Sequence, residues 1–310
     1  MLNILDIALA FPARTEQLPD VADSLGLSRN QTRMFDRFFG FDRFHHDETE
    51  AQQPLIEAAV APLLARNGDA RPSHVAHCHT LPSTGVFAAA TSDILAPFRD
   101  QGQEVFSATM NHCATGITML DTMSCLLDEG ETGLILIGEK AFHPDIRLIE
   151  NTTIMGEGAA AVLVGHAPGR YRLRGCLTRH APQFWQNTGH HDEAYLDGFE
   201  AAYLPFACDT LRAALTHFGI APAALRLVLP HNVNLTSWLQ IAQETGLARD
   251  QLWLKGIGRV GHCFGADPFI NLATAEAEGA LAAGDLLLLV SIGLGATASC
   301  ALLEVTTSHT

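Results

Sequence analysis

The chain has 310 residues, of which 47% are hydrophobic and 17% are charged. This length and composition suit one large or two modest globular domains with a substantial core. The formal net charge of −15 at pH 7 repels nucleic-acid phosphates and anionic lipid, so we expect neither as a partner. We also expect no membrane span, because apolar stretches such as residues 286–290 are far shorter than the ~20 residues a span needs.

The N-terminus and the cysteines both favour the cytoplasm. Residues 1–11 are apolar but lack the basic segment that opens a secretory signal. The seven cysteines do not have the spacing of a disulfide framework. We expect most of them to be small buried side chains.

The first seventy residues favour helices, and the pattern then changes. Apolar residues recur at helical spacing over 18–25 and 52–64, and Ser28 is a candidate N-cap for a helix that starts at Arg29. From Ser73 onward, short apolar runs alternate with helical segments, which is typical of α/β proteins. The strands expected in this region are 75–76, 105–107, 134–137 and 159–164.

Residues 165–169, Gly-His-Ala-Pro-Gly, interrupt both helix and strand. We therefore predict an N-terminal half of residues 1–167 and a C-terminal half of residues 168–310, and their similar alternation indicates a duplication. The second half is expected to contain helices at 201–217, 237–245 and 269–282 and strands at 225–229 and 286–292.

Cys113 is the first candidate for chemistry. It lies between a strand-like run and an apolar helical segment, with the small residues Ala114 and Gly116 beside it. The start of a helix favours a thiolate, which is the nucleophilic form of cysteine. The alternative is an ordinary buried core cysteine.

His231 is the second candidate, at the end of an apolar β-run that continues as His231-Asn232-Val233-Asn234. Binding groups collect at the carboxyl ends of strands in α/β proteins. His231 could exchange a proton with a substrate carbonyl while Asn232 or Asn234 fixes its orientation. The alternative is a turn in which the asparagines bond their own backbone.

His262 and Asp267 form the third candidate, in a Gly-rich loop before a predicted helix. Their spacing allows Asp267 to bond one imidazole nitrogen while the other faces a nucleophile. Asp267 could also be the N-cap of the helix, because Pro268 follows it. A fourth feature is Gly293-Leu294-Gly295 after the strongest predicted strand, whose amides could hold an oxyanion.

Two other patterns carry no prediction of a site. His77-Cys78-His79 and His112-Cys113 match no familiar zinc spacing, so we expect no metal. Gly156-Glu157-Gly158 precedes a strand instead of following one, so it does not fit a dinucleotide-binding motif.

The four features, taken in order along the chain, resemble the β-ketoacyl-acyl-carrier-protein synthase III family of the thiolase superfamily. The resemblance extends over nearly the whole chain, with further matches at residues 37–41 (Arg-Phe-Phe-Gly-Phe), residues 155–161 (Met-Gly-Glu-Gly-Ala-Ala-Ala) and Gly284-Asp285. It implies a thiolase fold, in which two duplicated α/β halves form a layered αβαβα arrangement, and a homodimer. It implies no cofactor, because coenzyme A or phosphopantetheine enters as part of a thioester substrate.

The same resemblance assigns roles to particular residues. Cys113 is similar to the acylated nucleophile, and His231 to the histidine of a His-Gln-Ala-Asn motif, which here reads His-Asn-Val-Asn with Asn232 and Asn234 as substrate-positioning residues. The backbone amides of Cys113 and Gly295 are similar to the oxyanion hole. This chain departs from the fatty-acid enzymes at Gly261-His262, where they have Gly-Asn.

That departure resembles family members from natural-product pathways that have a Cys-His-Asp set. We therefore expect an acyltransferase that loads an acyl group from acyl-CoA or an acyl-carrier protein onto Cys113. His262, backed by Asp267, would then help transfer it to a hydroxyl, amine or thiol acceptor in a secondary-metabolite pathway. The alternatives are a decarboxylative starter-unit synthase, in which His231 and His262 stabilise an enolate, a catalytically silent partner subunit, and a cysteine hydrolase.

A carrier protein would have to meet arginines, because the chain has only two lysines, Lys140 and Lys255. Arg33, Arg37, Arg43 and Arg147 could hold phosphates or be ordinary surface residues. The choice of donor and acceptor is expected to depend on the loops around residues 181–198, which the sequence does not place.

Overall fold

The computed structural model describes residues 1–68, 70–80, 94–109, 111–141, 144–184 and 193–306, with the backbone alone at 144–145, 193–198 and 200. Its strands are β1 Asn3–Ala10, β2 Thr15–Gln17, β3 Arg43–His45, β4 His74–Cys78, β5 Glu104–Ala108, β6 Thr132–Glu139, β7 Leu148–Ile149, β8 Thr153–Ile154, β9 Gly158–Gly165, β10 Tyr171–His180, β11 Leu225–Pro230, β12 Leu286–Gly293 and β13 Thr297–Val305. Its α-helices are α1 Leu18–Val21, α2 Arg29–Met34, α3 Gln52–Arg66, α4 Ala96–Arg99, α5 Thr115–Leu126, α6 Pro144–Arg147, α7 Glu193–Phe218, α8 Leu235–Thr245, α9 Ile257–Val260 and α10 Asp267–Ala277.

Among the described residues, nine strands form one sheet in the order β11-β12-β13-β10-β1-β9-β6-β4-β5. The sheet has two parts, which join between β1 and β10 through only two residue pairs, Asn3 with Arg172 and Ile4 with Tyr171. Along β1-β9-β6-β4 the pairing is antiparallel, antiparallel and then parallel, and β10-β13-β12-β11 repeats this pattern. The repeat confirms the predicted duplication of an α/β unit, while the boundary at residue 167 stays a prediction.

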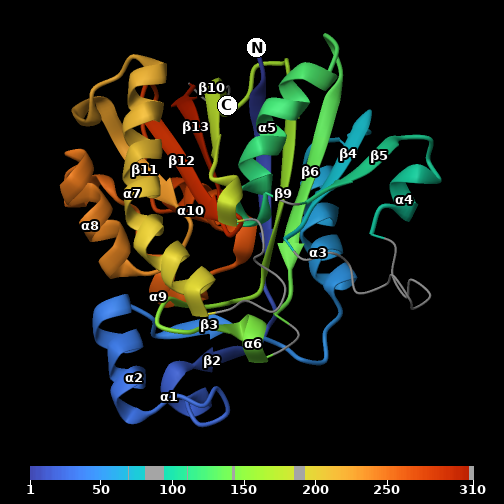
Figure 1. The fold of residues 1–310 in the computed structure, drawn as a ribbon. Helices are drawn as coiled ribbons and strands as arrows, with labels where there is room; N and C mark the ends of the chain where they lie inside the picture. Colours follow the sequence, from blue (N-terminus) through green and yellow to red (C-terminus); the bar gives the residue numbers. More distant parts are fainter. Residues whose placement is uncertain (69, 81–93, 110, 142–143, 185–192, 307–310) are drawn as a thin grey trace.

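The helices form layers around these two parts (Figure 1). α3 packs on the outer face of the N-terminal part, and α7 and α8 cover the outer face of the C-terminal part. α5 and α10 lie between the parts, and each contacts strands of both. This is the αβαβα order of the thiolase fold, as predicted.

The layers explain the apolar sequences of the central elements. β9 (GAAAVLVG) and β12 (LLLLVSIG) are nearly continuous apolar runs, as expected for strands covered on both faces. α10 is buried around most of its first two turns, and Asp267 and Asn271 are fully buried among its apolar side chains. Two buried polar side chains in such a helix need hydrogen-bond partners.

Most predicted elements are present, with two helices shorter than expected. The helix expected over 18–25 ends at Val21, whose carbonyl accepts a hydrogen bond from the Ser24 hydroxyl. The helix expected to reach residue 282 ends at Ala277, because Gly279 takes a left-handed conformation with φ of 67°. Ser28 caps α2 as predicted, because its hydroxyl accepts from the Gln31 amide and its own amide donates to the Gln31 side chain. β1, β10 and β13 were not predicted.

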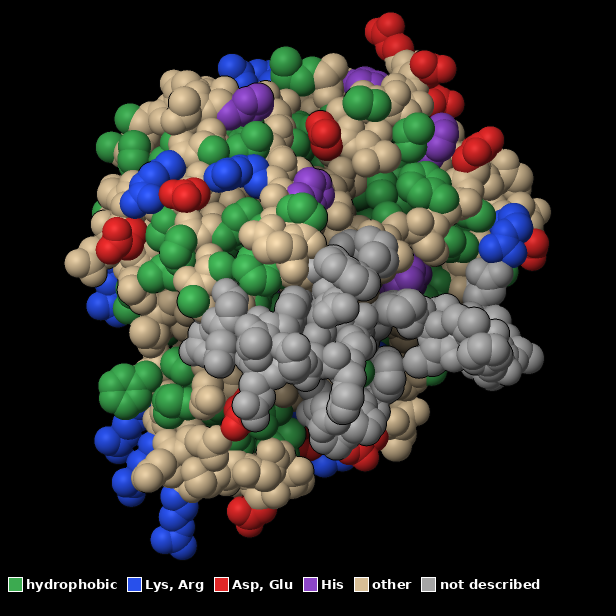
Figure 2. Space-filling view, in the orientation of Figure 1, with side chains coloured by type: hydrophobic (Ala, Val, Ile, Leu, Met, Phe, Trp, Pro, Cys, Tyr) green, Lys and Arg blue, Asp and Glu red, His purple; other side chains and the backbone are tan. Residues whose placement is uncertain are grey.

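The structure also bears on the expected membrane and cysteine properties. Within the described ranges, no helix combines the length and apolar character that a membrane crossing requires. All seven cysteines are free, and five of them are buried, which confirms the expectation for most of them. Figure 2 shows that side chains of both charges are scattered over one face, with arginine and lysine gathered at its lower left.

Candidate functional site

Cys113 lies in a tight 3-10 turn, His112–Ala114, that leads directly into α5. Its side chain is buried, and His112 before it has a left-handed φ of 49°, which is strained for a residue other than glycine. The end of β12 holds this turn in place, because the Ser291 hydroxyl donates to the Cys113 carbonyl at 2.6 Å. A Cβ at Gly293 would lie 2.3 Å from the Asn111 carbonyl oxygen, so only glycine allows this close approach.

His262 precedes α10 in the way that Cys113 precedes α5. A second 3-10 turn, Phe264–Ala266, leads into α10, and Phe264 is also left-handed, with φ of 52°. The His262 backbone is fixed by the N-terminal half: its amide donates to Ile154, and its carbonyl accepts from Gly156, each at 3.0 Å. The N-termini of the two central helices therefore bring the two side chains together.

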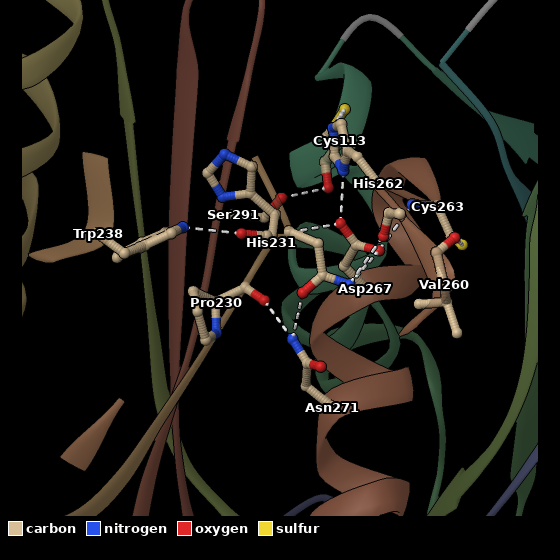
Figure 3. Close-up of polar contacts among 12 residues, drawn as sticks. Cys113, Pro230, His231, Trp238, Val260, His262, Cys263, Asp267, Asn271 and Ser291 are labelled. Carbon is tan, nitrogen blue, oxygen red and sulfur yellow. Dashed lines mark hydrogen bonds and ion pairs between the residues drawn. The ribbon is translucent and has the colours of Figure 1, made fainter. Parts of the chain in front are cut away.

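The three side chains form a continuous chain of contacts (Figure 3). The Cys113 Sγ lies 3.4 Å from the His262 Nε2, and the His262 Nδ1 lies 2.5 Å from the Asp267 Oδ2. All three side chains are buried. This is the geometry that the sequence predicted, with one nitrogen of His262 toward the carboxylate and the other toward the sulfur.

Asp267 receives more hydrogen bonds than the sequence indicated. Besides His262, its carboxylate accepts from the Cys263 amide at 2.7 Å and from the backbone and side-chain N–H groups of Asn232 at 2.6 and 3.1 Å. Asn271, one turn further along α10, donates to the Asn232 Oδ1 at 2.9 Å and to the Pro230 carbonyl at 2.7 Å. Asp267 is the first residue of the helix, and Ala266 is the N-cap, so the alternative reading of Asp267 as a cap is wrong.

The charges around His262 decide its protonation. Burial alone would lower the pKa of His262, but the negative charges of Asp267 and Cys113 and the hydrogen bonds to both raise it to about 10. His262 therefore holds a positive charge at neutral pH. The Cys113 sulfur therefore faces a positively charged imidazole at 3.4 Å.

His231 follows β11 and lies beside His262, with 5.6 Å between the ring centroids. The backbone of His231 is held by Trp238, whose indole N–H donates to the His231 carbonyl at 2.8 Å. The His231 Nε2 contacts the Tyr203 hydroxyl of α7 at 3.3 Å. Burial and the positive neighbour His262 lower the pKa of His231 well below its ordinary value, against an opposing effect of the Val290 carbonyl. His231 is therefore neutral.

In the structure, Asn232 and Asn234 form hydrogen bonds with groups other than the His231 ring. Asn232 bonds Asp267 and also the Gly261 carbonyl, at 3.1 Å. Asn234 is the N-cap of α8, accepting from the Ser237 amide at 2.7 Å, and its amide donates to Thr152 at 3.0 Å. The prediction that one of them orients His231 is therefore wrong for the described contacts. Asn234 matches the alternative of a turn that bonds its own backbone.

The predicted oxyanion hole is placed only in part. Gly295 has a φ of 125°, which requires glycine, but the glycine in close contact with the Cys113 turn is Gly293. A Cβ at Gly293 would lie 3.1 Å from the Cys113 amide nitrogen. The use of the Gly295 amide stays a prediction.

Among the described residues, no cluster of three or more His, Cys, Asp and Glu side chains is arranged to hold a metal ion. Arg147, one of the arginines considered for phosphate binding, is buried and donates to Glu157 at 2.6 Å and to the Met155 carbonyl at 2.7 Å. Lys140 contacts the same Glu157 at 3.0 Å. Arg33, Arg37 and Arg43 are exposed.

Sequence reasoning missed three residues of this site: Tyr203, Ser291 and Asn271. Ser291 and Asn271 are polar positions inside otherwise apolar elements, a signal that was available from the sequence. Tyr203 lies 28 residues before its partner on a different element, and no local pattern connects the two.

Comparisons with known proteins agree with this fold. Residues 215–305 match the family described as 3-oxoacyl-(acyl-carrier-protein (ACP)) synthase III C terminal. The beta-ketoacyl-(acyl-carrier-protein) synthase III of Rhodobacter capsulatus is 25% identical over 206 residues, covering 59% of this chain and 62% of the relative. The corresponding enzyme of Aquifex aeolicus is 25% identical over 204 residues, covering 62% of this chain and 64% of the relative. The matched region thus spans less than two thirds of either relative.

Solved structures match over almost the whole chain. The acyltransferase ChlB3 superposes with a TM-score of 0.84 at 15% identity, covering 99% of this chain and 98% of that one. The 3-oxoacyl-(acyl carrier protein) synthase III, FabH, of Pseudomonas aeruginosa PAO1 superposes with a TM-score of 0.81 at 19% identity, with the same coverage of both chains. At these identities the structures establish the thiolase fold alone.

Proposed function

We propose that this chain, whose sequence and fold are those of the FabH-like ketosynthase III family, is an acyltransferase that works through an acyl-Cys113 intermediate. The donor would be an acyl-CoA or acyl-carrier-protein thioester, and the acceptor a hydroxyl, amine or thiol of a biosynthetic, secondary-metabolite pathway. The observation that carries the proposal is the buried contact chain from the Cys113 Sγ through His262 to Asp267.

In the first step, the Cys113 thiolate attacks the donor carbonyl. The new bond joins the Cys113 sulfur to the acyl carbon, the donor carbon–sulfur bond breaks, and the departing thiolate takes the proton of His262. The amides of Cys113 and Gly295 would hold the oxyanion of the tetrahedral intermediate. Asp267 stabilises the charged form of His262 until that proton leaves.

The second step uses a change in His262 that follows from acylation. The negative charge of Cys113 is one cause of the raised pKa of His262, and the thioester no longer has that charge. The pKa of His262 should therefore fall, which lets its Nε2 accept the proton of the incoming hydroxyl, amine or thiol. The acceptor then forms the new bond to the acyl carbon, and Cys113 leaves as the thiolate that His262 stabilises again.

A decarboxylative starter-unit synthase is the second candidate. It is favoured by the curated relatives, which are beta-ketoacyl-(acyl-carrier-protein) synthases, and by the two neighbouring histidines. A silent partner subunit has no chemical reason to keep Cys113, His262 and Asp267 in contact. Residues 185–192 of the expected specificity loops lie outside the described residues. A homodimer in the cytoplasm stays a prediction.

Intact-protein mass spectrometry tests the proposal. The wild type is incubated with a panel of acyl-CoA and acyl-carrier-protein donors, and then with malonyl thioester or with hydroxyl, amine and thiol acceptors. We expect a mass gain of one acyl group that disappears with a nucleophilic acceptor and releases no carbon dioxide. Clearance by malonyl thioester alone, with carbon dioxide release, would support the synthase.

Two cysteine variants locate the acyl group. Cys113→Ala should form no adduct, whereas Cys125→Ala, which changes an exposed cysteine, should be acylated like the wild type. An adduct on Cys113→Ala would contradict the proposed nucleophile. The absence of an adduct from every donor would favour the silent subunit.

A further inference from the structure

Asn271 on α10 is a fully buried amide that lies behind the Asp267 carboxylate (Figure 3). Its Nδ2 donates to the Asn232 Oδ1 at 2.9 Å and to the Pro230 carbonyl at 2.7 Å. The Asn232 Nδ2 in turn donates to the Asp267 Oδ1 and to the Gly261 carbonyl, each at 3.1 Å. Two amide side chains therefore connect the end of β11 to the carboxylate of the site.

The direction of these hydrogen bonds is fixed at both ends by backbone carbonyls. The Pro230 and Gly261 carbonyls can only accept, so the amide atoms that face them are the nitrogens. Each of the two nitrogens uses both of its hydrogens, because each makes two bonds. Turning the Asn232 amide round would set its oxygen against the Gly261 carbonyl, and turning Asn271 round would set its oxygen against Pro230. Only one orientation of each amide is therefore satisfied.

The other end of the Asn271 amide shows which of its groups the fold uses. Its Oδ1 is buried and has no hydrogen-bond partner among the described residues. An apolar side chain would avoid the cost of an unpaired buried acceptor. A Cβ at Gly256 would lie 2.5 Å from this oxygen and 2.7 Å from the Asn232 Nδ2, so the backbone before α9 lies directly against both amides. The two hydrogen bonds that Asn271 donates therefore account for an amide at this position.

The orientation of Asn232 bears on Asp267, whose carboxylate bonds the His262 Nδ1 at 2.5 Å. The other donors to that carboxylate are the backbone amides of Asn232 and Cys263, which the fold of the chain fixes. The side-chain bond from Asn232 differs from these, because it is lost if the amide turns round.

We propose that Asn271 is a positioning residue that keeps the Asn232 amide turned toward Asp267 and so holds the Asp267 carboxylate against His262. The consequence for the reaction rests on the proposed function, because acyl transfer takes its proton steps through His262.

Asn271→Leu tests the inference, since it replaces the amide with an apolar side chain of similar size. The proton between the His262 Nδ1 and Asp267 is read by nuclear magnetic resonance on protein with isotopically labelled histidine nitrogens, and its signal is assigned by its loss in His262→Gln. We expect the signal to move upfield in Asn271→Leu, as a weaker hydrogen bond requires, and in the same direction in Asn232→Ala. Thr245→Val, which removes a hydroxyl that bonds the backbone of α8, is the matched control and should leave the signal unchanged.

The second measurement is the rate at which iodoacetamide alkylates Cys113 at pH 7, followed by mass spectrometry of the peptide that contains it. We expect a rate about fivefold lower in Asn271→Leu, which is the ratio that one hydrogen bond of ~1 kcal/mol corresponds to. Combined with Asn232→Ala, Asn271→Leu should cause no further decrease, because the amide through which it acts is absent. A role in packing alone would give the same decrease in both backgrounds.

Asn271→Ser keeps a hydroxyl donor in a smaller side chain, so it should lie between the wild type and Asn271→Leu in both measurements. It also serves if Asn271→Leu does not fold. An unchanged His262 signal in a folded Asn271 variant, or additive decreases with Asn232→Ala, would each overturn the inference. Neither measurement uses an acyl donor, so a failure of the proposed acyl transfer would be seen separately, as the absence of an acyl adduct.

Discussion

The two sides of the site contain histidines that are similarly buried but differ in charge, because His262 is protonated and His231 is neutral. His262 is 3% exposed and His231 is 1% exposed, and their ring centroids are 5.6 Å apart. Burial disfavours the charged form of both. The pKa of His262 is nevertheless raised to about 10, because Asp267 and Cys113 are beside it, whereas that of His231 falls well below its ordinary value.

The difference shows that burial favours the neutral form of an imidazole unless an ionised partner outweighs it. The partner of His262 is Asp267, which is itself held by hydrogen bonds from Cys263 and Asn232. His231 has a neutral phenol in the corresponding role. One side of the site therefore presents a charged imidazole to the Cys113 sulfur, while the other presents a neutral ring.

Removing the carboxylate of Asp267 should have the largest effect on the difference between the two histidines. Asp267→Asn removes the largest of the effects that oppose burial at His262, so the pKa of His262 should fall and the difference in charge between the two histidines should narrow. We expect the rate of Cys113 acylation near pH 7 to fall by about ten-thousandfold, as in other nucleophile-His-acid sites. Alkylation of Cys113 measured against pH should move to higher pH in the variant. An unchanged alkylation profile would contradict the role of Asp267.

The raised pKa of His262 should also make the free energy of unfolding depend on pH. Because His262 binds its proton more tightly in the folded state, its contribution to stability is complete below about pH 6.5 and is lost as the pH rises through about 10. Between these values, the free energy of unfolding should fall by up to about 1.4 kcal/mol per pH unit from this group. Urea unfolding at pH 7 and pH 9 should show a smaller decrease for His262→Gln than for the wild type. Equal decreases would rule out a raised pKa at His262.

Variants of the two asparagines near β11 should distinguish the hydrogen bonds that hold Asp267 from those that only stabilise α8. Asn234→Ala removes the N-cap of α8 and should lower the free energy of unfolding by about 1 kcal/mol without changing acylation of Cys113. Asn232→Ala removes a side-chain donor to Asp267, and it should slow acylation as well as lower stability. Urea unfolding and mass spectrometry on both variants check this. Slow acylation in Asn234→Ala would indicate that Asn234 has a part in the site.

Local patterns in the sequence were sufficient for the parts of the site that lie close together along the chain. His262 and Asp267 are five residues apart across one turn, and Cys113 opens an apolar helix, so spacing and residue type predicted both. The contact between Cys113 and His262 spans 149 residues, and only the resemblance to family members with a Cys-His-Asp set suggested it. The strands β1, β10 and β13 escaped prediction because their burial depends on neighbours from the other end of the chain.

The sequence by itself therefore determined the α/β alternation, the central apolar strands and helices, and the residues able to do the chemistry, because these depend on residue type and local spacing. The tertiary structure decided which of those residues meet. It paired Asn232 with Asp267 and Tyr203 with His231, and it set Gly293 against the Cys113 turn. These choices depend on how two halves of a sheet pack around α5 and α10, and packing between distant segments leaves no periodic signal in the chain.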